Sequence, residues 1–140
     1  MSNTLTIIVP VYNEEKNLKR VEKELQQYID KSKIPATILF VNDGSKDSSL
    51  QIIKEICLRN SAFNYLNFDK NYGLSAAIKA GFDHSESTLV GYIDSDLQTS
   101  PNDFSLLLEY IDDYDLVTGV RSNRKDNFIK NLSSKFANII

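Results

Sequence analysis

Short apolar runs alternate with amphipathic stretches along this chain. Runs rich in β-branched and aromatic residues predict buried strands. Between them, apolar residues recur every three or four positions, which is typical of helices that bury one face. The predicted strands cover residues 5–11, 36–41, 63–68, 88–93 and 115–119, and the predicted helices cover residues 14–31, 48–60, 74–84 and a segment that begins at Pro101.

Strands that alternate with helices predict an α/β fold, in which a mostly parallel sheet carries helices on both faces. Ligands of such open sheets bind beyond the carboxyl ends of the strands. The polar residues that follow each strand are therefore the candidates for chemistry. Acidic residues follow four of the predicted strands, and two arginines, Arg121 and Arg124, follow the fifth. Carboxylates favour a divalent cation or sugar hydroxyls, whereas arginines favour a phosphate.

The motif Asp94-Ser95-Asp96-Leu97-Gln98 carries the strongest chemical signal. On extended backbone, carboxylates at positions i and i+2 point to the same side and can converge on one ion. With the Gln98 amide oxygen as a further candidate, these hard donors suit Mg²⁺ or Mn²⁺ rather than zinc. The alternative is that the acids cap the next helix or are solvated. Acidic residues at the neighbouring strand ends favour the metal site.

The chain contains the segments IVPVYNEE (8–15), VNDGS (41–45), NYGL (71–74) and DSDLQ (94–98). Together these four segments resemble the inverting family 2 glycosyltransferases of the GT-A fold. Their order and spacing are specific, and the resemblance covers about residues 5–126. It implies a Rossmann-like sheet and transfer of a sugar, with inversion, from a nucleoside-diphosphate sugar. The Asp-x-Asp-Leu-Gln form is more similar to the branch that uses dolichol phosphate or undecaprenyl phosphate as acceptor.

The resemblance assigns the metal and phosphate contacts. Asp94, Asp96 and Gln98 match the site at which Mg²⁺ or Mn²⁺ bridges the donor's diphosphate and neutralises the leaving group. Arg121 and Arg124 resemble a phosphate-binding arginine cluster, because bidentate geometry favours arginine. The implied catalytic set is therefore Asp94, Asp96, Arg121 and Arg124.

The resemblance also implies a donor-binding set. Pro10, Tyr12 and Glu14 match the segment that lines the base and ribose. Asp43 matches the acid that hydrogen-bonds the base or ribose, and Gly44 allows close approach of backbone. Plainer interpretations stay open. In these, Tyr12 is an aromatic packed on the sheet end, Glu14 is a helix-terminal acid favoured by the dipole, and Asp43-Gly44 is an ordinary turn. The whole expected set is Pro10, Tyr12, Asn13, Glu14, Asp43, Gly44, Ser45, Asn71, Gly73 and Asp94.

Two parts of the chain are expected. Residues 1–126 form the nucleotide-sugar-binding core, and residues 127–140 begin an amphipathic helical segment that leads into a C-terminal part absent from this chain. Its apolar stripe, flanked by Lys130 and Lys135, packs on that part or lies at a membrane interface. The second alternative predicts peripheral membrane contact in the full-length protein.

Composition excludes several classes of protein. The 140 residues are 41% hydrophobic and 25% charged, as in an ordinary single domain rather than a disordered chain. A net charge of −3 provides no basic field that would attract nucleic acid. The single cysteine, Cys57, excludes an intrachain disulfide and fits a reducing compartment. We therefore expect a cytoplasmic protein. The resemblance to the polyprenyl-phosphate branch further implies a place at the inner face of the membrane and a contribution to cell-envelope polysaccharide.

The acceptor divides the remaining interpretations. A phosphate acceptor is already ionised and needs no strong general base, whereas a hydroxyl acceptor needs a further acid. No acidic residue follows Asp126 in this sequence, which either favours a polyprenyl phosphate or reflects a truncated chain. A transferase that acts on a saccharide hydroxyl stays open, as does a nucleotide-binding module without turnover. A phosphoacceptor domain fits less well, because Arg121 follows the fifth predicted strand where such a domain needs lysine.

Overall fold

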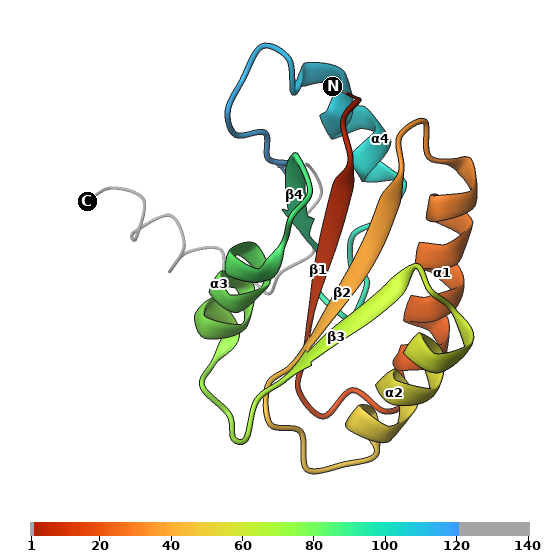
Figure 1. Ribbon diagram of the computed structural model, residues 1–140, viewed down its shortest axis with the longest axis vertical. Helices are drawn as coiled ribbons and strands as arrows, with labels where there is room; N and C mark the ends of the chain where they lie inside the picture. The colour runs from red at the N-terminus through yellow and green to blue at the C-terminus, as the bar shows by residue number, and fades with distance from the viewer. Residues whose placement is uncertain (1, 121–140) are drawn as a thin grey trace, which may run out of the picture. The chain divides into compact units, whose positions relative to one another are not determined.

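The computed structural model describes residues 2–120, and within them four parallel strands form one sheet in the order β3-β2-β1-β4 (Figure 1). The chain divides into two compact units, Met1–Leu106 and Leu107–Ile140, and the sheet lies in the first. The predicted α/β fold is confirmed. In chain order the elements are β1 (Leu5–Val11), α1 (Leu18–Lys31), β2 (Ala36–Asn42), α2 (Ser49–Arg59), β3 (Phe63–Asn67), α3 (Leu74–His84), β4 (Leu89–Tyr92), α4 (Asp103–Leu107) and the 3₁₀ helix η1 (Leu108–Tyr110).

Helices cover both faces of the sheet, with α1 and α2 on one face and α3 on the other (Figure 1). Every residue of β1 is buried, because this strand lies between β2 and β4 and alternate side chains enter the core on each face. Under α3, Ala77 packs on Ile8, Leu39 and Val41. On the opposite face, α1 buries one stripe of its side chains: Leu18, Val21, Leu25 and Tyr28.

Helix α1 begins later than the periodicity predicts. It was expected from residue 14, but Glu14 and the next three residues form a turn, in which the N–H groups of Asn17 and Leu18 donate to the Glu14 carbonyl at 2.9 and 3.2 Å. Asn13 has a φ of 55°, which a helix cannot contain. The N–H groups of residues 13–15 bond instead to side chains between the end of β2 and the first residue of α2, so α1 begins only after them.

The predicted fifth strand at residues 115–119 is wrong for the part of the chain that the structure describes. No strand ladder forms there. Leu116 and Val120 are 79% and 90% exposed, so the apolar run finds no layer to pack against. A strand requires hydrogen bonds from a neighbour, and the apolar pattern alone cannot supply them.

Some predictions concern residues beyond the described ones. Arg121, Arg124 and the amphipathic segment at 127–140 all lie outside residues 2–120. Within the described residues, no helix combines the length and apolar character that crossing a bilayer requires.

Candidate functional site

A cleft of about 320 Å³ lies at the carboxyl ends of the strands, where the loops that follow all four strands converge. This is where ligands of open parallel sheets bind. Most of the predicted site residues line it, whereas Asn13, Gly44, Ser45 and Gln98 do not. The lining residues are Pro10, Val11, Tyr12, Glu14, Asp43, Asn71, Gly73, Leu74, Asp94, Ser95 and Asp96.

A larger hollow, of about 710 Å³, lies at the amino ends of the strands. Its lining includes the hydroxyl residues Thr6, Thr37 and Ser87. The hydroxyl groups of Thr6 and Ser87 are hydrogen-bonded to each other at 2.7 Å. Glu86 supplies the one carboxylate among its lining residues. The carboxyl-end cleft gathers several carboxylates from separate loops. It is therefore the site at which a sugar, a cation or a cation-bound phosphate would bind.

Asp43 organises the cleft from the end of β2. Its side chain is 3% exposed, and its two carboxylate oxygens accept the N–H groups of Tyr72 and Gly73 at 2.7 and 2.9 Å. Its own N–H donates to the Val11 carbonyl at 2.8 Å. Asp43 thus ties the loop before α3 to the ends of β1 and β2. Each oxygen keeps a further lone pair for a ligand.

Gly44 allows that loop to lie directly against the end of β2. Its φ is +65°, which is unfavourable for residues with a Cβ. A Cβ at this position would lie 2.2 Å from the carbonyl carbon of Lys70 and 2.5 Å from the nitrogen of Asn71. Because both neighbours are backbone atoms, the loop would have to move. Gly44 thus permits a close approach of the protein's own backbone, and its expected part in binding the nucleotide sugar stays a prediction.

We expect Gly44→Ala to lower the free energy of unfolding by about 2–4 kcal/mol, from left-handed strain and displacement of the loop. Gly119→Ala is the matched control, because a Cβ there would meet nothing within 4 Å and its φ is not positive. Urea unfolding of the intact protein measures both. Equal stabilities of the two variants would contradict the close contact.

Hydrogen bonds join the loop after β1 to the segment after β2. They involve Asn13, Glu14 and Ser45. The N–H of Asn13 donates to the Ser45 hydroxyl at 3.0 Å, and the Asn13 side-chain oxygen accepts the N–H of Lys46 at 2.8 Å. The N–H of Glu14 donates to the Ser49 hydroxyl at 2.9 Å. Asn13 and Ser45 were predicted to bind the nucleotide sugar. In the structure they lie beside the cleft and hold the loops that form it.

Asp47 and Glu15, which were not among the predicted site residues, also join these two segments. Asp47 accepts the N–H of Ser49, the first residue of α2, at 2.9 Å, and the N–H of Glu15 at 3.2 Å. Glu15 in return accepts the N–H of Ser48 at 2.9 Å. Burial acts to raise the pKa of Asp47, but these hydrogen bonds outweigh it and lower the pKa below its ordinary value. Asp47 therefore stays ionised and keeps both loops in place.

The backbone at residues 94–98 is a turn and not the extended segment that we expected. The N–H of Leu97 donates to the Asp94 carbonyl at 3.1 Å, and Leu97 has a φ of 50°. The two carboxylates are therefore not brought together by the alternation of side chains on extended backbone. The turn nevertheless places both Asp94 and Asp96 on the cleft, while Asp96 also accepts the N–H of Gln98 at 3.1 Å.

The acidic pair fits a cation that takes only part of its ligands from protein. Asp94 is exposed and Asp96 is half-buried. Among residues 2–120, no group of three or more acidic, histidine or cysteine side chains could enclose an ion. Two hard carboxylates on an open cleft suit Mg²⁺ or Mn²⁺, which commonly complete their coordination with water and substrate phosphates.

Aromatic side chains stand around this end of the sheet. Tyr12 lines the cleft and is exposed, so its ring is accessible to a ligand. Tyr72 meets the edge of Phe68, with 5.5 Å between ring centroids, and Lys70 Nζ lies 5.2 Å from the Tyr72 ring centroid. A hydrogen bond to Asp69 raises the pKa of Tyr72, so its phenol stays protonated.

The sequence is similar to a known family over nearly its whole length. The model of the family described as glycosyl transferase family 2 matches residues 6–137. The uncharacterized glycosyltransferase YkcC of Bacillus subtilis (strain 168) is 38% identical over 130 residues, which are 89% of this chain and 39% of the relative. An undecaprenyl-phosphate 4-deoxy-4-formamido-L-arabinose transferase of Edwardsiella ictaluri (strain 93-146) is 34% identical over 136 residues, 96% of this chain and 42% of the relative. The chain thus spans about two fifths of these relatives.

Solved structures share the fold. The mannosyltransferase PcManGT from Pyrobaculum calidifontis, in complex with GDP-Man and Mn²⁺, has a TM-score of 0.65 at 18% identity, over 81% of this chain and 33% of that protein. S. aureus TarS 1–349, in complex with UDP-GlcNAc, has a TM-score of 0.61 at 23% identity, over 89% of this chain and 37% of that one. Both likenesses support the GT-A architecture expected from the sequence.

Proposed function

Because the chain belongs to glycosyl transferase family 2, we propose that its cleft binds the nucleoside diphosphate of a sugar donor and that the intact protein transfers this sugar. The observation that carries the proposal is the convergence of Asp43, Asp94 and Asp96 on one cleft at the carboxyl ends of parallel strands. The neighbours solved with GDP-Man and with UDP-GlcNAc support a donor of this class.

The cleft divides the donor between two sets of groups. Tyr12 and Glu14, at the end of β1, together with Asp43, offer an aromatic face and acceptor oxygens to the base and ribose. Asp94 and Asp96 would hold Mg²⁺ or Mn²⁺, which when bound would neutralise the charge that develops on the leaving diphosphate. The neighbour solved with Mn²⁺ supports this assignment. Gln98 is proposed as a further oxygen donor to the same ion.

We propose a polyprenyl phosphate as acceptor. A phosphate oxygen attacks the anomeric carbon and forms the new C–O bond while the bond to the diphosphate oxygen breaks. The electron pair leaves with the nucleoside diphosphate, and the configuration inverts. An ionised phosphate gives up no proton, so no general base is needed. Relatives named as undecaprenyl-phosphate transferases support this acceptor.

Arg121 and Arg124 would bind the acceptor phosphate, since arginine pairs with phosphate through two parallel hydrogen bonds. A lipid-linked acceptor would place the reaction at the cytoplasmic face of the membrane. The apolar stripe at residues 127–140, with Lys130 and Lys135 beside it, would supply peripheral contact with that surface.

Binding of a nucleoside diphosphate should depend on a divalent cation. We expect the best ligand among UDP, GDP, CDP and dTDP to bind at least about tenfold more tightly with Mn²⁺ than with EDTA, because two carboxylates otherwise face an anion. Isothermal titration calorimetry on the intact protein measures this ratio. Equal affinities would contradict the metal assignment, and binding without sugar transfer to any acceptor would indicate a nucleotide-binding module.

A further inference from the structure

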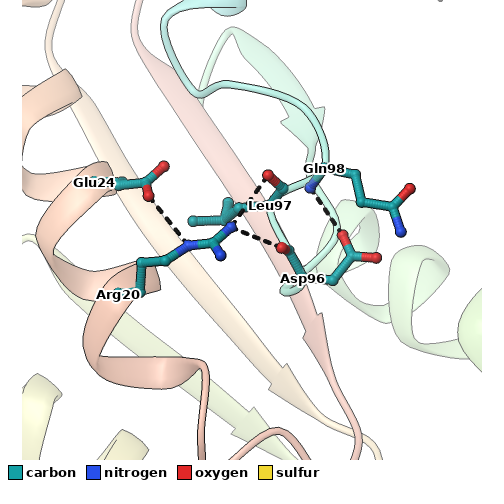
Figure 2. A network of polar contacts seen from close by, with 5 residues as sticks. All are labelled: Arg20, Glu24, Asp96, Leu97 and Gln98. Carbon is teal, nitrogen blue, oxygen red and sulfur yellow. Dashed lines mark hydrogen bonds and ion pairs between the residues drawn. The ribbon is translucent and has the colours of Figure 1, made fainter.

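Arg20 reaches from α1 to the turn that carries the two cleft aspartates, and it contacts the backbone there (Figure 2). Its Nη2 atom donates to the backbone carbonyls of Asp96 and Leu97, at 2.8 and 3.2 Å. More than seventy residues of sequence separate the partners. Arg20 does not line the cleft, so its contact with the site is through this backbone alone.

The turn needs such support. Leu97 adopts a φ of 50°, which is unfavourable for a residue with a branched side chain, and its side chain is buried. The bond from its N–H to Asp94 and the bond from Gln98 N–H to the Asp96 carboxylate close the turn from within. The guanidinium satisfies the two consecutive carbonyls that these bonds leave open. The backbone carbonyl of Asp96 bonds to Arg20, and its carboxylate lies on the cleft. Fixing the carbonyl therefore restricts the position of the carboxylate.

The guanidinium is itself oriented. Nε of Arg20 pairs with Glu24, one helical turn further along α1, at 3.2 Å (Figure 2). One planar group thus bonds to a carboxylate on its own helix and to two carbonyls of a distant turn. Lysine would keep the charge but could not reproduce this fixed fork.

We infer that Arg20 is a positioning residue, which holds Asp94 and Asp96 in the arrangement that receives the donor's diphosphate and its cation. The inference rests on the function proposed above. Without Arg20 the turn would sample other arrangements, and binding would have to pay for ordering it. The loss would therefore fall on donor and cation affinity, and on turnover that depends on the same arrangement, more than on global stability.

The test compares Arg20→Ala, Arg20→Lys and Arg59→Ala with wild type in the intact protein. Arg59 is the matched control, because it is 53% exposed against 52% for Arg20 and also pairs with a glutamate, Glu22. It stands at the end of α2, away from the cleft. Calorimetry measures binding of the best of UDP, GDP, CDP and dTDP with Mn²⁺. Hydrogen–deuterium exchange of a peptide that covers residues 94–98 reports on the turn directly.

For Arg20→Ala we expect affinity to fall on the order of tenfold and exchange at residues 94–98 to accelerate, because hydrogen bonds from a charged donor are lost. Arg20→Lys should lie between Arg20→Ala and wild type, about threefold below wild type, because lysine keeps the charge but cannot reproduce the fork. Arg59→Ala should stay within about twofold, as exposed ion pairs contribute little.

Wild-type affinity and unchanged exchange in Arg20→Ala would overturn the inference. An equal loss in Arg59→Ala would overturn it too, since the effect would then be general destabilisation. A wild-type protein that binds none of the four diphosphates with Mn²⁺ contradicts the proposed function itself. The positioning role then falls with it, whatever the exchange at residues 94–98 shows.

Discussion

Replacing Asp96 with asparagine should lower the turnover of the proposed sugar transfer by the intact protein at least about 10²-fold, the cost of removing one electrostatic contact with a developing charge. Asparagine keeps the shape of the side chain, and its carbonyl oxygen can still accept the N–H of Gln98, which Asp96 accepts at 3.1 Å. The turn at residues 94–98 should therefore survive. What is lost is one of the two charges that the turn presents to the cleft.

Sugar transfer with Mn²⁺, measured beside thermal unfolding, distinguishes lost chemistry from lost structure. Asp83→Asn is the control, because Asp83 forms an exposed ion pair with Lys79 on α3 and does not line the cleft. We expect this control to retain turnover, since such pairs contribute little. Activity of Asp96→Asn within about threefold of wild type would be far from the loss expected of an electrostatic contact, and would place the cation elsewhere.

Arg124→Ala should impair use of the lipid acceptor by about tenfold or more while leaving donor affinity nearly intact. In the proposed reaction, the acceptor phosphate approaches a diphosphate that is already negative. At an effective dielectric near 20, two unit charges about 4 Å apart repel by about 4 kcal/mol, and an arginine beside the acceptor offsets this repulsion. The expected signature is a raised KM for the polyprenyl phosphate with an unchanged KM for the donor.

The measurement is transfer of a radiolabelled sugar to extractable polyprenyl phosphate, run beside a panel of soluble saccharides. Arg59→Ala again serves as the control, because it removes an exposed arginine from the end of α2. Label that moves to saccharides and not to the lipid phase would contradict the acceptor assignment, and the glycosyltransferase assignment would stand. A donor KM that rises in parallel would indicate that Arg124 acts on the donor side.

The location of the cleft was predictable because it follows from local pattern and a topological rule. The apolar run at residues 5–11 and its counterparts show their period over a few residues, and each ends at a polar residue. In a parallel sheet, those ends meet at one edge. Asp43, Asp94 and Asp96 therefore line one cleft, as expected, although they lie far apart in the sequence.

The local pattern led to wrong predictions where the secondary structure depends on contacts with another segment of the chain. Residues 115–119 have the composition of a strand, but in the described part of the chain they have no ladder and no covering layer. Residues 14–17 continue the helical period, but the N–H groups of Glu14 and Glu15 bond to Ser49 and Asp47. At residues 14–17, contacts from elsewhere in the chain outweigh the local preference for helix. At residues 115–119, the contacts that a strand requires are missing.

The sequence by itself determined the α/β class, the family and which strand ends carry the acids, because these depend on periodicity and on residue order. Only the tertiary structure decided what each side chain does there. Asn13 and Asp47 hold loops, Gly44 makes room for backbone, and Arg20 supports the turn beneath Asp96. Hydrogen bonds act over about 3 Å, and no pattern along the chain shows which distant residues the fold brings within that distance.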